Sequence, residues 1–247
     1  MQVAIISDIH GNAVALDTVL EDIEQVDPDK IVCLGDVAAT GPEPIRAIER
    51  IQALGCPVIN GNADEDWLLE KEHPEEDSDE DDSQMVFEVR DWTAAQLSPE
   101  HKRFIESFED TVEIDLTDNA RLLCYHGTPE SPWDIINEQT SVEELDEYID
   151  STAAEILIGG HNHNQLVRRY RDATFVNAGS VGLAFGTPRE HREHNWPWGE
   201  WALVTASNDS VSIDLRRTAL NLDDMFVAAR DSELPNSEEW IGWWRKT

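Results

Sequence analysis

Five short polar segments combine side chains that bind metal ions with glycines that permit sharp turns. They are Asp8-Ile9-His10, Gly35-Asp36, Gly61-Asn62, His126-Gly127 and Gly160-His161-Asn162-His163. Four of the eight histidines of the chain lie in these segments. Carboxylate, amide and imidazole groups without a thiolate suit Mn, Fe, Zn, Ni or Co better than a structural cysteine-zinc site. The pattern predicts a metal centre assembled from distant parts of the chain.

Each polar segment follows a short apolar run of the kind that forms a buried β-strand. Among the first 60 residues, runs at 3–6, 31–34 and 57–59 alternate with stretches of helical periodicity at 13–23 and 45–54. This order predicts the strands of a parallel sheet that is covered on both faces. Ligands bind outside the carboxyl ends of such strands, so the polar segments should meet there.

The spacing within two of the segments predicts how they hold an ion. Asp8 and His10 are two positions apart. On an extended segment their side chains would therefore share one face and could bind the same ion. His161 and His163 repeat this spacing.

The chain changes in character after a helical stretch at 84–109. Seven short strands, mainly antiparallel, are predicted beyond it, at 112–116, 121–125, 156–158, 166–170, 173–176, 201–205 and 211–215. Asn236 to Glu239 has the pattern of a capping box, and Trp240, Trp243 and Trp244 follow at helical spacing. We expect this tryptophan stripe to pack on the domain or on a sister subunit rather than to bind a ligand.

The chain is strongly acidic. Its 247 residues include 52 Asp and Glu against 18 Lys and Arg, which gives a formal net charge of −34. Residues 70–83 are mostly acidic and predict a solvated surface loop. An acidic, lysine-poor surface is typical of proteins from salt-loving organisms, because molar salt shortens the Debye length to about 3 Å and screens self-repulsion. The same charge disfavours binding to long nucleic acids.

We therefore expect the melting temperature to rise with KCl concentration, because salt screens the repulsion among the acidic side chains. Melting curves followed by circular dichroism, from low salt to molar KCl, measure this effect. A melting temperature that does not change across the series would contradict the halophilic interpretation.

Hydropathy and cysteine use narrow the class of protein further. No stretch approaches the roughly 18 uncharged apolar residues of a membrane helix. Asp8 and His10 interrupt the beginning of the chain before a signal-peptide core could form. Cys33, Cys56 and Cys124 have no metal-binding spacing and are expected to be small buried side chains. We expect a cytoplasmic protein without a membrane anchor.

Taken in order, the motifs D-x-H, GD, GN, HG and GHxH resemble the calcineurin-like metallophosphoesterase superfamily, over residues 3 to about 215. The stretches Gly41-Pro42-Glu43-Pro44 and Asn177-Ala178-Gly179-Ser180-Val181-Gly182 further resemble its small bacterial and archaeal phosphodiesterase branch. The resemblance implies an α/β fold of mixed type, a four-layer αββα sandwich with the metals between the sheets. We expect one such domain over residues 1–247, with the acidic loop at 70–83 and a helical appendage at about 219–247.

The resemblance also implies two divalent metal ions, with Mn favoured and Fe, Zn, Ni or Co as alternatives, and no further cofactor. Asp8, His10 and His163 would hold the first ion. Asn62, His126 and His161 would hold the second, and Asp36 would bridge both. Two such ions deprotonate a shared water, and the bridging hydroxide attacks the phosphoryl group. Asp36, Asn62 and His126 are the ligands expected to act in catalysis, whereas Asn177 and Ser180 would shape the loop beside the metals.

One position departs from the pattern of the family. Many relatives place a histidine directly after the asparagine of the GN motif, where it assists the leaving group, but this chain has Ala63 followed by Asp64. General-acid assistance contributes about 10²–10⁴-fold, so esters with poor leaving groups should react slowly. Asp64 is expected to be a surface residue, with a substitute acid as the second interpretation, and its replacement should matter little.

The sequence thus predicts a hydrolase of phosphate esters that acts on a phosphodiester or a small phosphorylated metabolite. One alternative is a non-catalytic interaction module, because a retromer subunit of this fold works in that way, although none of the seven expected ligands is missing here. A nuclease is the other alternative, which the net charge and the lack of a basic groove signature disfavour. The sequence leaves homo-oligomerisation open.

Overall fold

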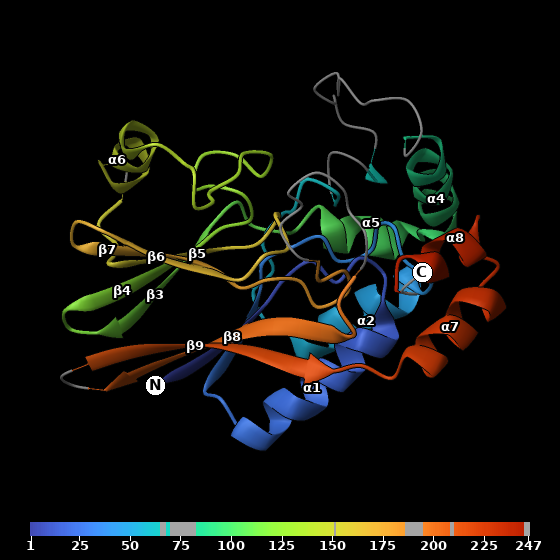
Figure 1. Ribbon diagram of the computed structural model, residues 1–247, viewed down its shortest axis with the longest axis horizontal. Helices are drawn as coiled ribbons and strands as arrows, with labels where there is room; N and C mark the ends of the chain where they lie inside the picture. Colours follow the sequence, from blue (N-terminus) through green and yellow to red (C-terminus); the bar gives the residue numbers. More distant parts are fainter. Residues whose placement is uncertain (65–67, 70–82, 151, 186–194, 208–209, 245–247) are drawn as a thin grey trace.

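Two β-sheets packed face to face form the centre of the computed structural model, which describes residues 1–64, 68–69, 83–150, 152–185, 195–207 and 210–244 (Figure 1). The strand order is β2-β1-β8-β9 in the first sheet and β3-β4-β5-β7-β6 in the second. The first sheet comprises β1 (Gln2–Ile6), β2 (Lys30–Cys33), β8 (Trp198–Ser207) and β9 (Ser210–Ala219). The second comprises β3 (Val112–Thr117), β4 (Ala120–Cys124), β5 (Ile156–Gly159), β6 (Leu166–Tyr170) and β7 (Ala173–Asn177).

Helices cover the outer faces of both sheets, which gives the αββα order that the resemblance implies. In β1, Val3 and Ile5 lie in the apolar cluster between the sheets, whereas Ala4 and Ile6 pack against helices. This alternation follows from the side-chain direction in a strand, and it explains why the apolar run of β1 is unbroken. Helices α1 (Ala13–Val26) and α2 (Pro44–Leu54) cover the first sheet, and α6 (Val142–Asp150) lies over the second (Figure 1).

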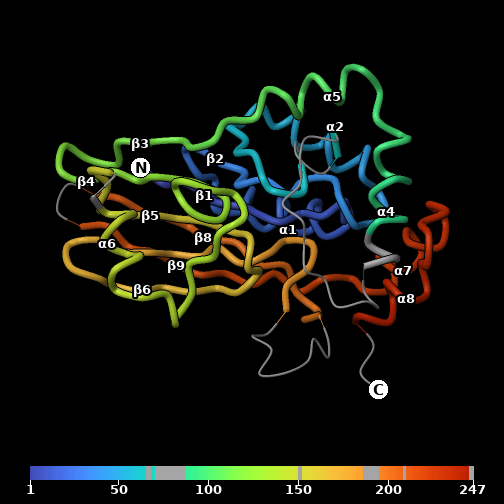
Figure 2. Tube along the Cα trace, turned by 90° about the horizontal axis from the view of Figure 1, so that it is seen from above, coloured from blue at the N-terminus to red at the C-terminus, as the bar shows by residue number. Residues whose placement is uncertain are grey.

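The other described helices gather towards one end of the sandwich (Figure 2). They are α4 (Ser83–Gln96), α5 (Pro99–Ile105), α7 (Leu222–Asp231) and α8 (Ser237–Gly242). Trp240 and Trp244 are buried in an apolar cluster with Val89 of α4 and Met225 of α7. The tryptophan stripe therefore packs on the rest of the chain, which confirms that expectation.

The sheet pairing differs from the sequence prediction at one predicted strand. Residues 57–59 do not extend the parallel sheet as a strand and form only isolated bridges, to Cys33 and Glu109. Pro57 has no N–H for a ladder, which favours this short, irregular pairing. The second half of the chain is mainly antiparallel, as predicted, since β3–β4, β6–β7 and β8–β9 pair in that way, but β5 pairs in parallel with both β4 and β7. These parallel pairs bring the loops after β4, β5 and β7 to one edge of the second sheet.

Two further expectations concern the ends of helices and the acidic loop. Asn236 precedes α8 in a left-handed conformation with φ of 55°, and its side chain donates a hydrogen bond to Glu88 (2.8 Å) instead of capping the helix. The capping box is therefore not formed. The acidic loop at 70–83 lies outside the described residues as far as residue 82. Among the residues that the structure describes, no helix is long and apolar enough to cross a membrane.

Candidate metal centre

The structure brings together all seven side chains that the sequence analysis selected as ligands, at the edge where the loops of both sheets meet. The loops after β1, β2, β4 and β5 supply six of them, namely Asp8, His10, Asp36, His126, His161 and His163. Their ligand atoms form two groups, each within 4.8 Å, which are Asp8, His10, Asp36 and His163, and Asp36, His126 and His161. Asn62 joins the second group, because its Oδ1 lies 3.0 Å from His126 Nε2.

The backbone at the site is not extended, contrary to the geometry inferred from the spacing. Five of the seven residues are left-handed, with φ between 49° and 67°, namely Asp8, His10, Asp36, His161 and His163. A non-glycine residue in this region is uncommon, although Asp and His tolerate it better than most, and it marks functional sites where the surrounding structure holds it. Because the chain turns at each of these residues, His161 and His163 reach different groups.

Backbone carbonyls fix the orientation of the imidazoles. The Nδ1 atoms of His10, His126 and His163 lie 3.1, 2.7 and 2.9 Å from the carbonyl oxygens of Ala39, Leu34 and Leu183, respectively. An Nδ1–H that donates to a carbonyl leaves the Nε2 lone pair free and aims it at the centre, as metal-binding histidines require. His161 is reversed, because its Nε2 contacts the carbonyl of Trp133 (3.1 Å) and leaves Nδ1 as the free nitrogen.

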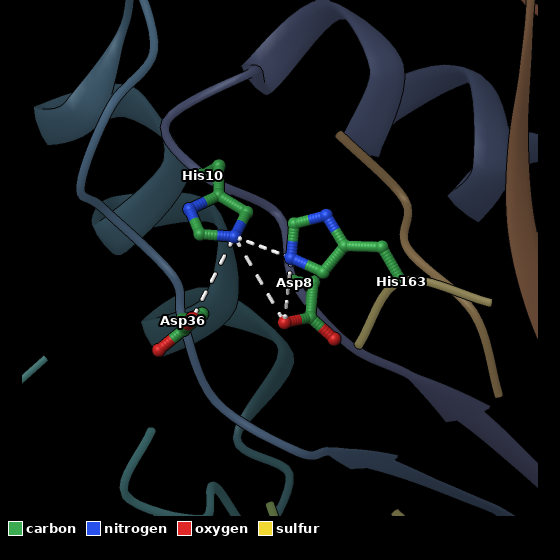
Figure 3. A group of neighbouring side chains, drawn as sticks. All are labelled: Asp8, His10, Asp36 and His163. Atoms are coloured by element: carbon green, nitrogen blue, oxygen red, sulfur yellow. Dashed lines mark hydrogen bonds and ion pairs between the residues drawn. The ribbon is translucent and has the colours of Figure 1, made fainter. Parts of the chain in front are cut away.

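The first group has the donor arrangement that a cation would stabilise. His10 Nε2 and His163 Nε2 are 3.0 Å apart (Figure 3), so two lone pairs converge when both Nδ1 atoms carry the proton. Asp8 Oδ1 is buried, accepts no hydrogen bond, and lies 3.2 Å from His163 Nε2. Converging nitrogen and carboxylate donors without a competing proton donor fit a divalent metal ion.

Asp36 belongs to both groups. Its Oδ1 accepts a hydrogen bond from the Ala63 N–H (2.8 Å), which fixes the carboxylate. Its Oδ2 lies 3.6 Å from His10 Nε2 and 3.5 Å from His126 Nε2, between the two groups. Gly61 allows this approach, because a Cβ at that position would collide with the Asp36 carboxylate. The arrangement suits a carboxylate that bridges two ions.

Burial and neighbouring charges set the protonation of the site. Burial, together with a neighbouring imidazole, lowers the pKa of His10 and of His161 to about 4. Burial would raise the pKa of Asp8, but the adjacent His163 imidazole outweighs it and lowers the value to about 2. Burial would lower the pKa of His126, but the Asp36 carboxylate raises it to about 9. At neutral pH, Asp8 is thus anionic and the His10 and His161 imidazoles are neutral, as metal binding needs. His126 is protonated at this pH and must release a proton when an ion binds.

Hydrogen bonds between loops hold the two sheets in register at the site. Ser180 Oγ, from the loop after β7, donates to the Asp8 carbonyl (2.7 Å), and the His161 N–H donates to Asp8 Oδ2 (3.0 Å). Asn177 Nδ2 donates to the Gly160 carbonyl. Gly160 lies so close to Asp8 that a Cβ there would collide with the carboxylate. Asn177 and Ser180 thus shape the loops around Asp8 without belonging to either group.

Asp64 is fully buried, so the expectation of a surface residue is wrong. Its carboxylate accepts hydrogen bonds from the backbone N–H groups of Asp36 (2.7 Å), Val37 (2.9 Å) and Gly61 (3.2 Å). Burial and the Asp36 carboxylate raise its pKa. Because both of its oxygens face the backbone, Asp64 positions the loop of Asp36 against the loop of Asn62 and does not replace the missing acid. Its partners are main-chain groups, which leave no pattern in a sequence.

Comparison with known proteins agrees with this geometry. The family model of the calcineurin-like phosphoesterase superfamily domain matches residues 1–192. The chain belongs to this superfamily. The resemblance drawn from the motifs is thereby confirmed.

Three relatives of this calcineurin-like phosphoesterase illustrate the similarity. The crystal structure of a metallophosphoesterase from Sphaerobacter thermophilus is 25% identical, with 96% of each chain covered and a TM-score of 0.71. The hypothetical protein PH1004 from Pyrococcus horikoshii shares the fold, at 20% identity, 98% coverage of each chain and a TM-score of 0.78. The uncharacterized protein MJ0912 of Methanocaldococcus jannaschii is 26% identical over 185 residues, which cover 73% of this chain and 70% of that protein.

Asp36→Asn should weaken Mn binding by more than about 100-fold, because the amide keeps an oxygen for the Ala63 N–H but loses the charge between the two groups. Mn content after dialysis, measured by mass spectrometry, and the Mn-dependent rise in melting temperature report this loss. Asp172→Asn, in an exposed turn, is the matched control and should behave as the wild type. An unchanged Mn content in Asp36→Asn would contradict the bridging arrangement.

Asp64→Ala should weaken Mn binding by about 10–100-fold, although its carboxylate faces neither group of ligands. The change leaves three buried N–H groups without their acceptor, at about 1–3 kcal/mol each, and releases the loop of Asp36. Calorimetric titration with Mn measures the affinity, and circular dichroism checks that the variant is folded. Wild-type affinity in a folded Asp64→Ala protein would show that the carboxylate does not position the site.

Proposed function

We propose that this chain is a metal-dependent phosphoesterase that hydrolyses a phosphodiester or a small phosphorylated metabolite. Two divalent cations, preferably Mn, would support the reaction. Asp8, His10 and His163 would hold one ion and Asn62, His126 and His161 the other, with Asp36 shared. The position of Asp36 Oδ2 between His10 and His126 carries the proposal, because a carboxylate shared by two sets of imidazoles is suited to a pair of ions.

The protein supplies position and charge to this reaction. When bound, the two cations acidify a water molecule and neutralise the phosphoryl oxygens. The carbonyl-bound imidazoles and the anchored Asp36 carboxylate hold their donor atoms in place before substrate arrives, so little reorganisation is needed during the reaction. Ala63, which is 4% exposed, offers no proton to the leaving oxygen. The leaving group must therefore depart without general-acid assistance from that position.

Two alternatives have less support. An interaction module has no need of a buried, fully assembled donor set with left-handed backbone at five ligand positions, which is costly to maintain. A nuclease for long chains would have to bind a polyanion despite a net charge of −34. Metal-dependent turnover of a small ester separates the first alternative from the proposal.

The proposal predicts Mn-dependent hydrolysis of bis(p-nitrophenyl) phosphate at high KCl, followed by release of p-nitrophenolate. Asp36→Ala should lower kcat/KM by at least about 10³-fold, because one change removes a ligand from both ions, and Asp172→Ala should retain activity. Because no acid replaces the missing histidine, a dialkyl phosphate should react much more slowly than the diaryl ester, and we expect the rate to fall steeply as the leaving group becomes more basic.

Two results would count against these expectations. Hydrolysis that persists in Asp36→Ala, or that needs no added or bound metal, would refute the two-metal proposal. Equal rates for alkyl and aryl esters, with chemistry rate-limiting, would instead show that another group supplies the proton.

A further inference from the structure

A pocket of about 770 Å³ opens beside the candidate metal centre. The sequence analysis did not predict it. His161, a member of the second ligand group, forms part of its lining. Side-chain amides and aromatic rings make up much of the rest, including Asn137, Gln165, Trp196 and Trp198. A pocket of this size holds a ligand the size of a small metabolite. A group attached to a phosphate at the metal centre can therefore extend into it.

The aromatic part of the pocket forms a flat platform. The rings of Trp196 and Trp198 are stacked, with centroids 4.8 Å apart and planes 7° from parallel. The Arg217 guanidinium lies over Trp198, 5.0 Å from its ring centroid. Trp196 is 38% exposed and stands among the lining residues. Its ring thus offers planar surface to the pocket, and a flat aromatic ligand stacks on such a surface.

The platform is fixed by contacts on several sides. The Trp196 N–H donates to the Ala184 carbonyl (2.7 Å), and the neighbouring Asn195 N–H donates to the Trp243 carbonyl (2.6 Å). Trp198 Nε1 donates to Glu200 Oε1 (3.1 Å), and Glu200 is 3% exposed. A platform held in place before binding loses little entropy when a ligand arrives.

The charges around the pocket decide what kind of group it accepts. Among the described residues that line it, Arg217 is the one with a permanent positive charge, and Glu200 pairs with it (3.1 Å). Glu138 adds a second carboxylate. The described part of the lining therefore disfavours a further phosphate, whereas its amides can hydrogen-bond an uncharged polar ring.

We infer that this pocket binds the nucleoside part of the substrate, with the base stacked on Trp196 and the phosphodiester at the metal centre. The inference rests on the proposed phosphoesterase function and names its substrate class, a phosphodiester of a single nucleoside. An uncharged planar base with hydrogen-bonding edges matches the rings and the amides of the described lining. A polyphosphate does not match it, because Arg217, the one permanent cation of that lining, is paired with Glu200.

Two substrates with the same leaving group test the inference, namely the p-nitrophenyl ester of thymidine 5′-phosphate and methyl p-nitrophenyl phosphate. The nucleoside ester should have a kcat/KM at least about tenfold higher, mainly through KM, because stacking of the base on an aromatic side chain strengthens substrate binding. Trp196→Ala should bring the ratio of the two kcat/KM values close to one. Phe87→Ala, which removes an exposed aromatic ring outside the pocket, should keep the wild-type ratio.

A binding experiment separates failure of the inference from failure of the proposed function. Calorimetric titration with AMP and with ribose 5-phosphate, in the presence of Mn, compares ligands that share a phosphate and differ by the base. AMP should bind about tenfold more tightly to the wild type and lose that advantage in Trp196→Ala. If neither ester is hydrolysed but AMP keeps its advantage, the phosphoesterase proposal fails and the pocket assignment stands. Equal affinities, or an advantage that survives Trp196→Ala, would overturn the inference.

Discussion

The Asp36 carboxylate lies between two sets of imidazoles, and much of the structure keeps it there. A buried carboxylate is costly unless it is paired and hydrogen-bonded. One oxygen of Asp36 is fixed by the Ala63 N–H, and the other faces His10 and His126. Behind it, the Asp64 carboxyl group accepts hydrogen bonds from the backbone of the same loop. The position of one carboxylate is thus determined by main-chain contacts as well as by its own packing.

The order of the strands explains how distant residues converge on this carboxylate. The parallel pairs β1–β2, β4–β5 and β5–β7 all end at the edge where the two sheets meet. A loop that leaves such a strand must turn at once to keep its side chain at the edge, and the left-handed conformations of Asp8, Asp36 and His161 provide that turn. The strain is local, whereas the hydrogen bonds that offset it join both sheets.

The sequence predicted most of the strands, the family and the side chains that converge at one edge, because apolar runs and the residue types after them follow simple rules of burial and coordination. It failed where main-chain geometry decides the outcome. The spacing of Asp8 and His10 could not reveal that both turn the chain. Asp64 is buried against backbone N–H groups that have no sequence signature. Trp196 and Trp198 form a Trp-Pro-Trp run in the sequence, but only the fold shows that their rings stack in the pocket beside the candidate metal centre.

The hydrogen bond from Asn195 to the Trp243 carbonyl joins the wall of the pocket to the end of α8. That wall also includes Trp196, Trp198, Glu200 and Arg217, which follow residue 192, where the match to the superfamily ends. All seven metal-centre residues precede it. Under the proposed function, substitutions in the terminal fifth of the chain can therefore reshape the aromatic platform and change the ligand that it favours, while the metal-ligand residues and the pocket amides stay unchanged.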